Sequence, residues 1–136
     1  MKYKINYDAD IVLVTGDRNL KDPRIVYKWL TKFESIKLVI HGNAKGADSG
    51  AEHWAKIAPV PYLGVPAKWT KEGKAAGPIK NSAMLSWISM IEQAQGKDSV
   101  KVQVLAFHRN KKQSKGTKDM MNKANKAGYN VYLVSE

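Results

Sequence analysis

The sequence contains no cysteine among its 136 residues. Disulfide bonds, thiolate catalysis and thiolate metal sites are therefore excluded, and the composition is compatible with a reducing compartment. Apolar runs are short as well, and none approaches the roughly 20 residues that a membrane-spanning helix needs. The segment from Met1 to Tyr7 lacks the apolar centre of a signal peptide. The sequence predicts a cytoplasmic protein with no membrane partner.

Acidic residues are scarce relative to basic ones, with 12 Asp and Glu against 23 Lys and Arg and a formal net charge of +11. A protein of this charge attracts polyanions such as nucleic acids, nucleotides or acidic surfaces, and charge alone does not distinguish among them. The length corresponds to one domain, so we expect a single domain over residues 1–136.

Short apolar runs alternate with helical patterns along the chain, which is typical of repeated strand–helix units and a mainly parallel sheet. Strands are predicted over residues 11–14, 38–40, 62–65, 100–107 and 131–134. Helices are predicted over residues 22–33, around 51–58, over 78–95 and over 117–127, and a polar binding loop over 67–77. We expect Trp29, Trp54 and Trp87 to lie in the core because each occupies an apolar helix face.

Right-handed crossovers then predict an α/β fold with a doubly wound, five-stranded sheet of order 3-2-1-4-5. Pro61 and Pro66 bracket the third strand, which places that strand at a sheet edge. Ligands bind such sheets outside the carboxyl ends of the strands. The loops expected there carry ten cations and few acids, which predicts a phosphate-binding rim; the cations are Arg18, Lys21, Lys45, Lys68, Lys71, Lys74, Arg109, Lys111, Lys112 and Lys115.

Two glycine-bearing loops follow the first two strands and are the strongest site candidates. Gly16 precedes Arg18 in the first loop, and Gly42 and Gly46 precede Asp48 in the second. A missing Cβ lets backbone N–H groups approach a phosphate at the positive end of a helix. The alternative is that these glycines only permit tight turns, that Arg18 forms a structural ion pair, and that Asp48 caps the second helix.

Further candidates lie in the later loops. Trp69 is placed either to stack on a base or to cover the sheet edge, and Ser114 and Thr117 flank Gly116 either as phosphate donors or as caps of the final helix. His41 and His108 are candidate phosphate contacts. The histidines show no metal-ligand spacing, so we predict no metal and no cofactor.

Several ordered motifs together resemble a known family. They are Val14-Thr15-Gly16-Asp17-Arg18, His41-Gly42 with Gly46-Ala47-Asp48, Pro66-Ala67-Lys68-Trp69 with Gly73, Ala76-Gly77-Pro78-Ile79-Lys80-Asn81, and Ser114-Lys115-Gly116-Thr117-Lys118-Asp119-Met120. From about residue 10 to the C-terminus, the chain is similar to the YspA-like group of the SLOG superfamily. This superfamily includes the "lonely guy" nucleoside-monophosphate phosphoribohydrolases and nucleotide-derivative sensors of bacterial and phage conflict systems.

The resemblance implies a Rossmann-like three-layer sandwich that binds a nucleotide or nucleotide-derived ligand, and copies that pair into a homo-oligomer. It adds Lys80 and Asn81 to the ligand-binding candidates, although the family's usual arginine is Lys80 here. The hydrolases carry a GGxGTxxE loop, whereas this chain has Gln113-Ser114 for the first two glycines and Met120 for the glutamate, with Asp119 one residue earlier.

Three functional hypotheses follow. The first is a binder of an ADP-ribose or cyclic-nucleotide type of ligand, acting as a sensor or a sequestering protein. The second is a nucleotide N-glycosidase in which Asp48 or Asp119 polarises the ribose, and this chemistry would need two carboxylates converging on one sugar. The third is a basic nucleic-acid-binding module, which is weakened by the lack of a helix-turn-helix or an aromatic nucleic-acid motif. The missing glutamate favours binding over catalysis.

Overall fold

The computed structural model describes residues 5–17, 20, 22–43, 45–108 and 115–135. Its centre is a sheet of five parallel strands in the order β3-β2-β1-β4-β5. The strands are β1 (Ile11–Gly16), β2 (Leu38–His41), β3 (Tyr62–Gly64), β4 (Val102–His108) and β5 (Asn130–Ser135). The predicted strand order and the edge position of the third strand are confirmed, and every strand pair is parallel.

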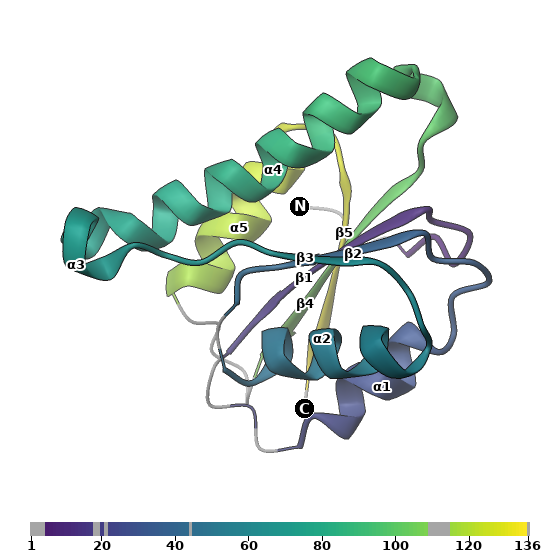
Figure 1. The fold of residues 1–136 in the computed structure, drawn as a ribbon, viewed down its shortest axis with the longest axis horizontal. Coiled ribbons are helices and arrows are strands. Elements are labelled where there is room, and N and C mark those ends of the chain that lie inside the picture. Colours follow the sequence, from purple (N-terminus) through teal and green to yellow (C-terminus); the bar gives the residue numbers. More distant parts are fainter. Residues whose placement is uncertain (1–4, 18–19, 21, 44, 109–114, 136) are drawn as a thin grey trace.

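Helices cover both faces of this sheet, which confirms the three-layer arrangement (Figure 1). They are α1 (Arg24–Leu30), α2 (Ala47–Ile57), α3 (Trp69–Glu72), α4 (Ala76–Gln95) and α5 (Lys115–Lys126), with short 3-10 turns at Gly73–Ala75 and Lys97–Ser99. The first two helices lie on one face, and α4 and α5 lie on the other.

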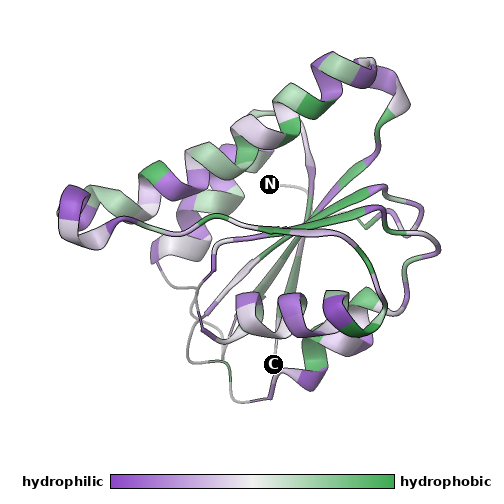
Figure 2. Cartoon of the chain, in the orientation of Figure 1, coloured by the Kyte–Doolittle hydropathy of each residue, from purple (hydrophilic) through white to green (hydrophobic). Residues whose placement is uncertain are grey.

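Strand β1 shows why the apolar runs are continuous. Val12 and Val14 belong to the core beneath α1 and α2, whereas Ile11 and Leu13 belong to the core beneath α4 and α5. Successive side chains of a strand point to opposite faces, so a sheet covered on both sides needs apolar residues at every position. Figure 2 shows the resulting apolar centre of the sheet between helices that carry both polar and apolar residues.

The helix boundaries differ from the prediction in three places. The first helix covers only Arg24–Leu30, because the chain leaves the helix in turns before Phe33. The segment 67–77 is not an open loop, because it contains α3, a 3-10 turn and the first two residues of α4. Pro78 is the third residue of α4 and is tolerated there because N–H groups in the first turn have no intrahelical partner.

The start of the last helix and one tryptophan also differ from expectation. Helix α5 begins at Lys115, so Thr117 lies inside its first turn, where it is buried, and does not act as the cap. Trp87 is 43% exposed and does not belong to the core, whereas Trp29 and Trp54 are half-buried against the core under α1 and α2. Across the described ranges, no helix is both long and apolar enough to cross a bilayer.

Candidate functional site

A cleft of about 1000 Å³ opens at the carboxyl ends of β1 and β2. Its walls come from β1 and β2, from the loops that follow β1, β2 and β3, and from parts of α2, α3, α4 and α5. The lining residues are Thr15, Gly16, Asp17, His41, Gly42, Asn43, Lys45, Asp48, Ser49, Glu52, Pro66, Ala67, Trp69, Gly77, Lys80, Asn81, Gly116 and Thr117. Segments far apart in the sequence thus meet at the edge of the sheet where parallel α/β folds bind ligands.

Gly16 and Gly42 leave room for different neighbours. A Cβ at Gly16 would lie 2.5 Å from the carbonyl oxygen of Phe107 and 2.8 Å from the Cβ of Ala47, so the glycine is required for the packing of β1 against β4 and α2. A Cβ at Gly42 would lie 2.7 Å from Nζ of Lys80 and 2.9 Å from Oδ2 of Asp48. Gly42 therefore lets two charged side chains approach the backbone inside the cleft.

Asp48 lies in the first turn of α2 and is only 4% exposed. Its Oδ2 accepts a hydrogen bond from the backbone N–H of Gly42 at 3.1 Å. The carboxylate thereby connects the loop after β2 to the start of α2, where the helix dipole stabilises negative charge. The helix follows Gly46, whose φ of 73° is in the region that glycine adopts at low cost.

His41, which is buried, pairs with the half-buried Glu52 beside Lys80. Nδ1 of His41 accepts the backbone N–H of Asn43 at 3.0 Å, so the ring proton is on Nε2, which donates to Oε1 of Glu52 at 3.1 Å. Burial lowers the pKa of the His41 imidazole below its ordinary value, and the nearby Lys80 ammonium lowers it further, against the opposing effect of Glu52. His41 is consequently a neutral positioning group that directs Glu52.

This lowered pKa predicts a pH dependence of stability. The unfolded chain takes up the His41 proton near the ordinary value of 6.5, before the folded chain does. The contribution of His41 to the free energy of unfolding should therefore be complete above pH about 6.5 and should decrease as the pH falls below that value. In His41→Gln the decrease in the free energy of unfolding should be smaller. Urea denaturation at intervals of about half a pH unit between roughly pH 7.5 and pH 5 measures this difference. Parallel curves for the two proteins would contradict this account of His41.

The start of α5 is joined to α4 through Asn81. Its Nδ2 donates to the carbonyl oxygen of Gly116 at 3.1 Å and to Oδ2 of Asp119 at 2.9 Å, and Asn81 itself is buried. The same Oδ2 lies 2.9 Å from Nζ of Lys123. Asp119 is thus occupied in the contact between two helices, and it is absent from the described lining of the cleft.

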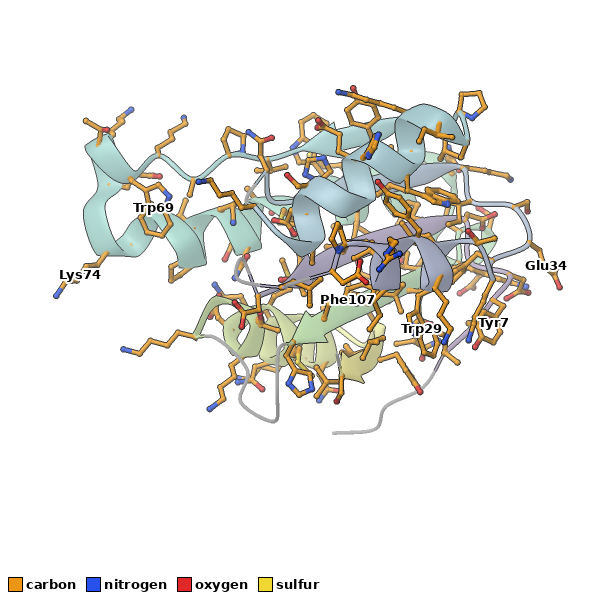
Figure 3. The ribbon with its side chains drawn as sticks, turned by 90° about the horizontal axis from the view of Figure 1, so that it is seen from below. Tyr7, Trp29, Glu34, Trp69, Lys74 and Phe107 are labelled. Atoms are coloured by element: carbon orange, nitrogen blue, oxygen red, sulfur yellow. The ribbon has the colours of Figure 1, made fainter. Side chains whose placement is uncertain are left out.

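Trp69 lies on α3 at the projecting end of the molecule, beside the start of α4 (Figure 3). The indole is 58% exposed, and its Cη2 would be in ordinary contact, at 3.4 Å, with a Cβ on Gly77. An exposed aromatic ring at the mouth of a cleft is suited to stack on a planar ligand group. Trp69 therefore lines the cleft.

The structure brings together most of the residues proposed from the sequence. Those lining the cleft are Gly16, Gly42, Asp48, Trp69, Lys80, Asn81, Gly116 and Thr117. Within the described ranges, Gly46 and Asp119 are not part of the lining, and Arg18 and Ser114 lie outside the described residues. His108 lies at the end of β4, where its Nε2 is 2.8 Å from Oγ of Ser135 at the edge strand. The functional roles of all these residues stay predictions.

The charge of the described lining differs from the predicted rim of cations. Lys45 and Lys80 are accompanied by the carboxylates of Asp17, Asp48 and Glu52. Four of the expected cations, Lys68, Lys71, Lys74 and Lys115, are described but do not line the cleft, while Arg18, Lys21, Arg109, Lys111 and Lys112 lie outside the described residues. Most of the described lysines of these loops therefore lie outside the lining of the cleft.

Glu52 is the lining residue of most chemical interest that the sequence interpretation missed. It follows Asp48 by four residues, and side chains at this spacing share one face of a helix. The helical pattern of α2 combined with Asp48 was the signal that could have identified it. In the part of the chain that the structure describes, acidic and histidine side chains do not gather in threes as a metal would require.

Comparison with known protein families gives a match over the N-terminal part of the chain. Residues 10–71 match the family model described as YAcAr: YspA, cpYpsA-related SLOG family. The matched segment runs from the residue before β1 into α3, and it includes the loops of Gly16 and Gly42. No curated protein and no solved structure matches the chain. The match confirms the resemblance seen in the sequence motifs over this segment.

Proposed function

We propose, from the premise that residues 10–71 belong to the YspA, cpYpsA-related SLOG family, that the cleft binds a nucleotide or nucleotide-derived ligand of the ADP-ribose or cyclic-nucleotide type. The family is linked to nucleotide-derived ligands. In our proposal the protein binds this ligand without turnover and acts as a sensor or a sequestering protein. The observation that carries the proposal is one cleft in which two lysines, three carboxylates and an exposed indole meet.

Lys80 and the glycine-bearing segments are suited to the phosphate. The Lys80 ammonium lies against the backbone of Gly42, in the loop that leads into α2. A phosphate there would interact with a full positive charge and with the positive end of the helix dipole. Gly116 lines the same cleft from the first turn of α5, and no described atom lies within 4 Å of a Cβ built on it. Its missing side chain therefore leaves space for a ligand.

The carboxylates and Trp69 are suited to the rest of a nucleotide. Glu52 and Asp48 lie on one face of α2 and line the cleft, and carboxylate oxygens can accept hydrogen bonds from ribose hydroxyl groups. Glu52 is held by His41 and by Lys56, and 31% of its side chain remains exposed. The Trp69 ring offers a stacking surface for the base. A volume of about 1000 Å³ lies at the upper end of small-molecule sites, which suits an extended nucleotide derivative.

Binding without turnover is supported by the placement of Asp119. An N-glycosidase would need Asp48 and Asp119 to converge on one ribose. Oδ2 of Asp119 instead accepts the amide of Asn81 and lies beside the Lys123 ammonium, which ties it to the helix contact. Two other carboxylates of the cleft already have partners, because Asp48 accepts the backbone N–H of Gly42 and Glu52 accepts the ring N–H of His41.

The test is ligand-induced stabilisation measured together with product analysis. ADP-ribose, AMP and cyclic AMP are each titrated into the protein, and adenosine is the control that lacks phosphate. We expect at least one phosphorylated ligand to raise Tm while adenosine does not, and chromatography to find no released adenine. A Tm unchanged by every phosphorylated ligand would contradict binding, and adenine released from AMP would contradict binding without turnover.

A further inference from the structure

A second cavity lies at the end of the sheet opposite the candidate site. Helix α4 ends at Gln95 shortly before β4, and α5 ends at Lys126 shortly before β5. These two strands are parallel neighbours, with Gln103 beside Asn130, so both helices end near the amino ends of the strands. Between the two helices, which lie on the same face of the sheet (Figure 1), is a groove of about 900 Å³. This volume is within the range of small-molecule sites, and we call it the α4–α5 groove.

The α4–α5 groove is elongated, and part of its lining is apolar. It follows α4 from Ser82 to Gln93, which is about 16 Å at the rise of an α-helix. The side chains of Leu85, Val100 and Val102 line it together with polar groups. A ligand with an extended chain of methylene groups would therefore bury apolar surface there.

The polar lining presents hydrogen-bond acceptors, because two of its hydroxyl groups donate within the protein. Oγ of Ser86 donates to the carbonyl oxygen of Ser82 at 3.0 Å, and the hydroxyl of Tyr129 donates to Oε1 of Glu92 at 2.5 Å. Burial and the bond to Glu92 raise the pKa of the Tyr129 hydroxyl, so this group keeps its proton. A ligand in the α4–α5 groove thus meets the lone pairs of Ser86 and Glu92, and it must supply the donors.

The charges around the α4–α5 groove favour a cation. Glu92 and Asp98 line it with two carboxylates, and Lys97 and Lys123 line it with two ammonium groups. Nζ of Lys123 lies 2.9 Å from Oδ2 of Asp119, outside the groove, so its charge is already paired. Both helices also direct the negative ends of their dipoles to this end of the sheet, and the last turn of α4 holds no basic residue that would offset its dipole.

We propose that the α4–α5 groove is a second binding site, and that it takes a linear aliphatic diamine or triamine. An ammonium group has three donors and no acceptor, which matches a lining of carboxylates and free lone pairs. The methylene chain would contact Leu85, Val100 and Val102, and the ring of Tyr129 offers a face for a cation–π contact. Most of the surface of a protein with net charge +11 repels a polycation, so binding of such a ligand requires a local site.

Isothermal titration calorimetry of the full chain with putrescine and with spermidine tests the proposal, and butanediol is the uncharged control. We expect saturable binding of at least one amine and no binding of the diol. Glu92→Gln keeps an acceptor for Tyr129 and should weaken amine binding about tenfold or more, because a hydrogen bond to a charged group is lost. Glu72→Gln removes the same charge from a residue of α3 that lines neither cavity, and its affinity should stay within about twofold of the wild type.

Two variants at exposed residues show the sign of the charge that the α4–α5 groove prefers. Asp98→Asn should weaken amine binding, and Lys97→Ala should strengthen it, because a like charge is removed from the lining; an anion would respond in the opposite way. Both residues are exposed, so circular dichroism should match the wild type. The proposal is overturned if neither amine binds saturably, if the diol binds as well as putrescine, if Glu92→Gln and Asp98→Asn keep full affinity, or if Lys97→Ala weakens amine binding. No nucleotide is used, so the result is independent of the proposed function.

Discussion

Gly16→Ala is expected to lower the free energy of unfolding by about 3 kcal/mol, which is the size of a severe overpacking defect. The new Cβ would be 2.5 Å from the carbonyl oxygen of Phe107, a backbone atom of the central strand β4, and 2.8 Å from the Cβ of Ala47 at the start of α2. Neither neighbour can rotate away as a flexible side chain would, so a strand or a helix must shift. Urea denaturation followed by circular dichroism measures the loss.

Gly116→Ala is the matched control, because it adds the same methyl group at another glycine of the cleft. No described atom lies within 4 Å of the added Cβ, and Gly116 is exposed in the first turn of α5. The free energy of unfolding should stay unchanged or rise by up to about 1 kcal/mol, since alanine favours helix. Gly116→Val should keep the fold as well but remove the nucleotide-induced rise in Tm. If Gly16→Ala is as stable as the wild type, the packing role assigned to Gly16 is wrong.

Lys80→Ala is expected to weaken binding of the phosphorylated ligand by about 10- to 150-fold, which corresponds to the roughly 1.5–3 kcal/mol of a hydrogen bond to a charged group. The Lys80 ammonium is the charged group that approaches the Gly42 loop inside the cleft. Isothermal titration calorimetry at one fixed salt concentration measures the change, because the attraction of a net charge of +11 for any anion depends on ionic strength.

Lys74→Ala is the control for Lys80→Ala, since it removes the same charge from an exposed residue of the 3-10 turn that does not line the cleft. Its affinity should stay within about twofold of the wild type, because an exposed charge outside the site acts only through a screened field. Lys80→Arg keeps the charge and should retain most of the affinity. Equal losses in Lys80→Ala and Lys74→Ala would mean that the ligand senses only the overall charge of the molecule.

The strands and their order were predictable because local signals determine them. Ile11 to Val14 is a continuous apolar run before Gly16, and such a run needs a sheet covered on both faces. The right-handed crossover rule then leaves few topologies, and the structure has the predicted one. The helix starts were less predictable, because a proline is compatible with several positions in a first turn. Pro78 was read as the beginning of α4, although α4 begins two residues earlier.

The site was only partly predictable, because its chemistry depends on contacts between distant segments. The two glycine loops and Trp69 were identified from their positions after strands, and they line one cleft. Glu52 was missed because its importance comes from His41, eleven residues earlier, which is buried and directs its proton to the carboxylate. Asp119 acts on a ribose only in the enzyme hypothesis, and its contacts with Asn81 and Lys123 were not predictable because they depend on how α4 packs against α5.

The sequence by itself determined the parallel α/β sheet, its strand order and the edge at which glycine-bearing loops gather, because these follow from the periodicity of apolar residues and from chain connectivity. Only the tertiary structure decided that Gly16 is needed for packing while Gly116 borders open space, and that carboxylates accompany Lys45 and Lys80 in the cleft. It also decided that Trp87 points outward on α4. The physical reason is that an apolar helix position is equally compatible with a core and with an interface until the packing of the neighbouring elements is known.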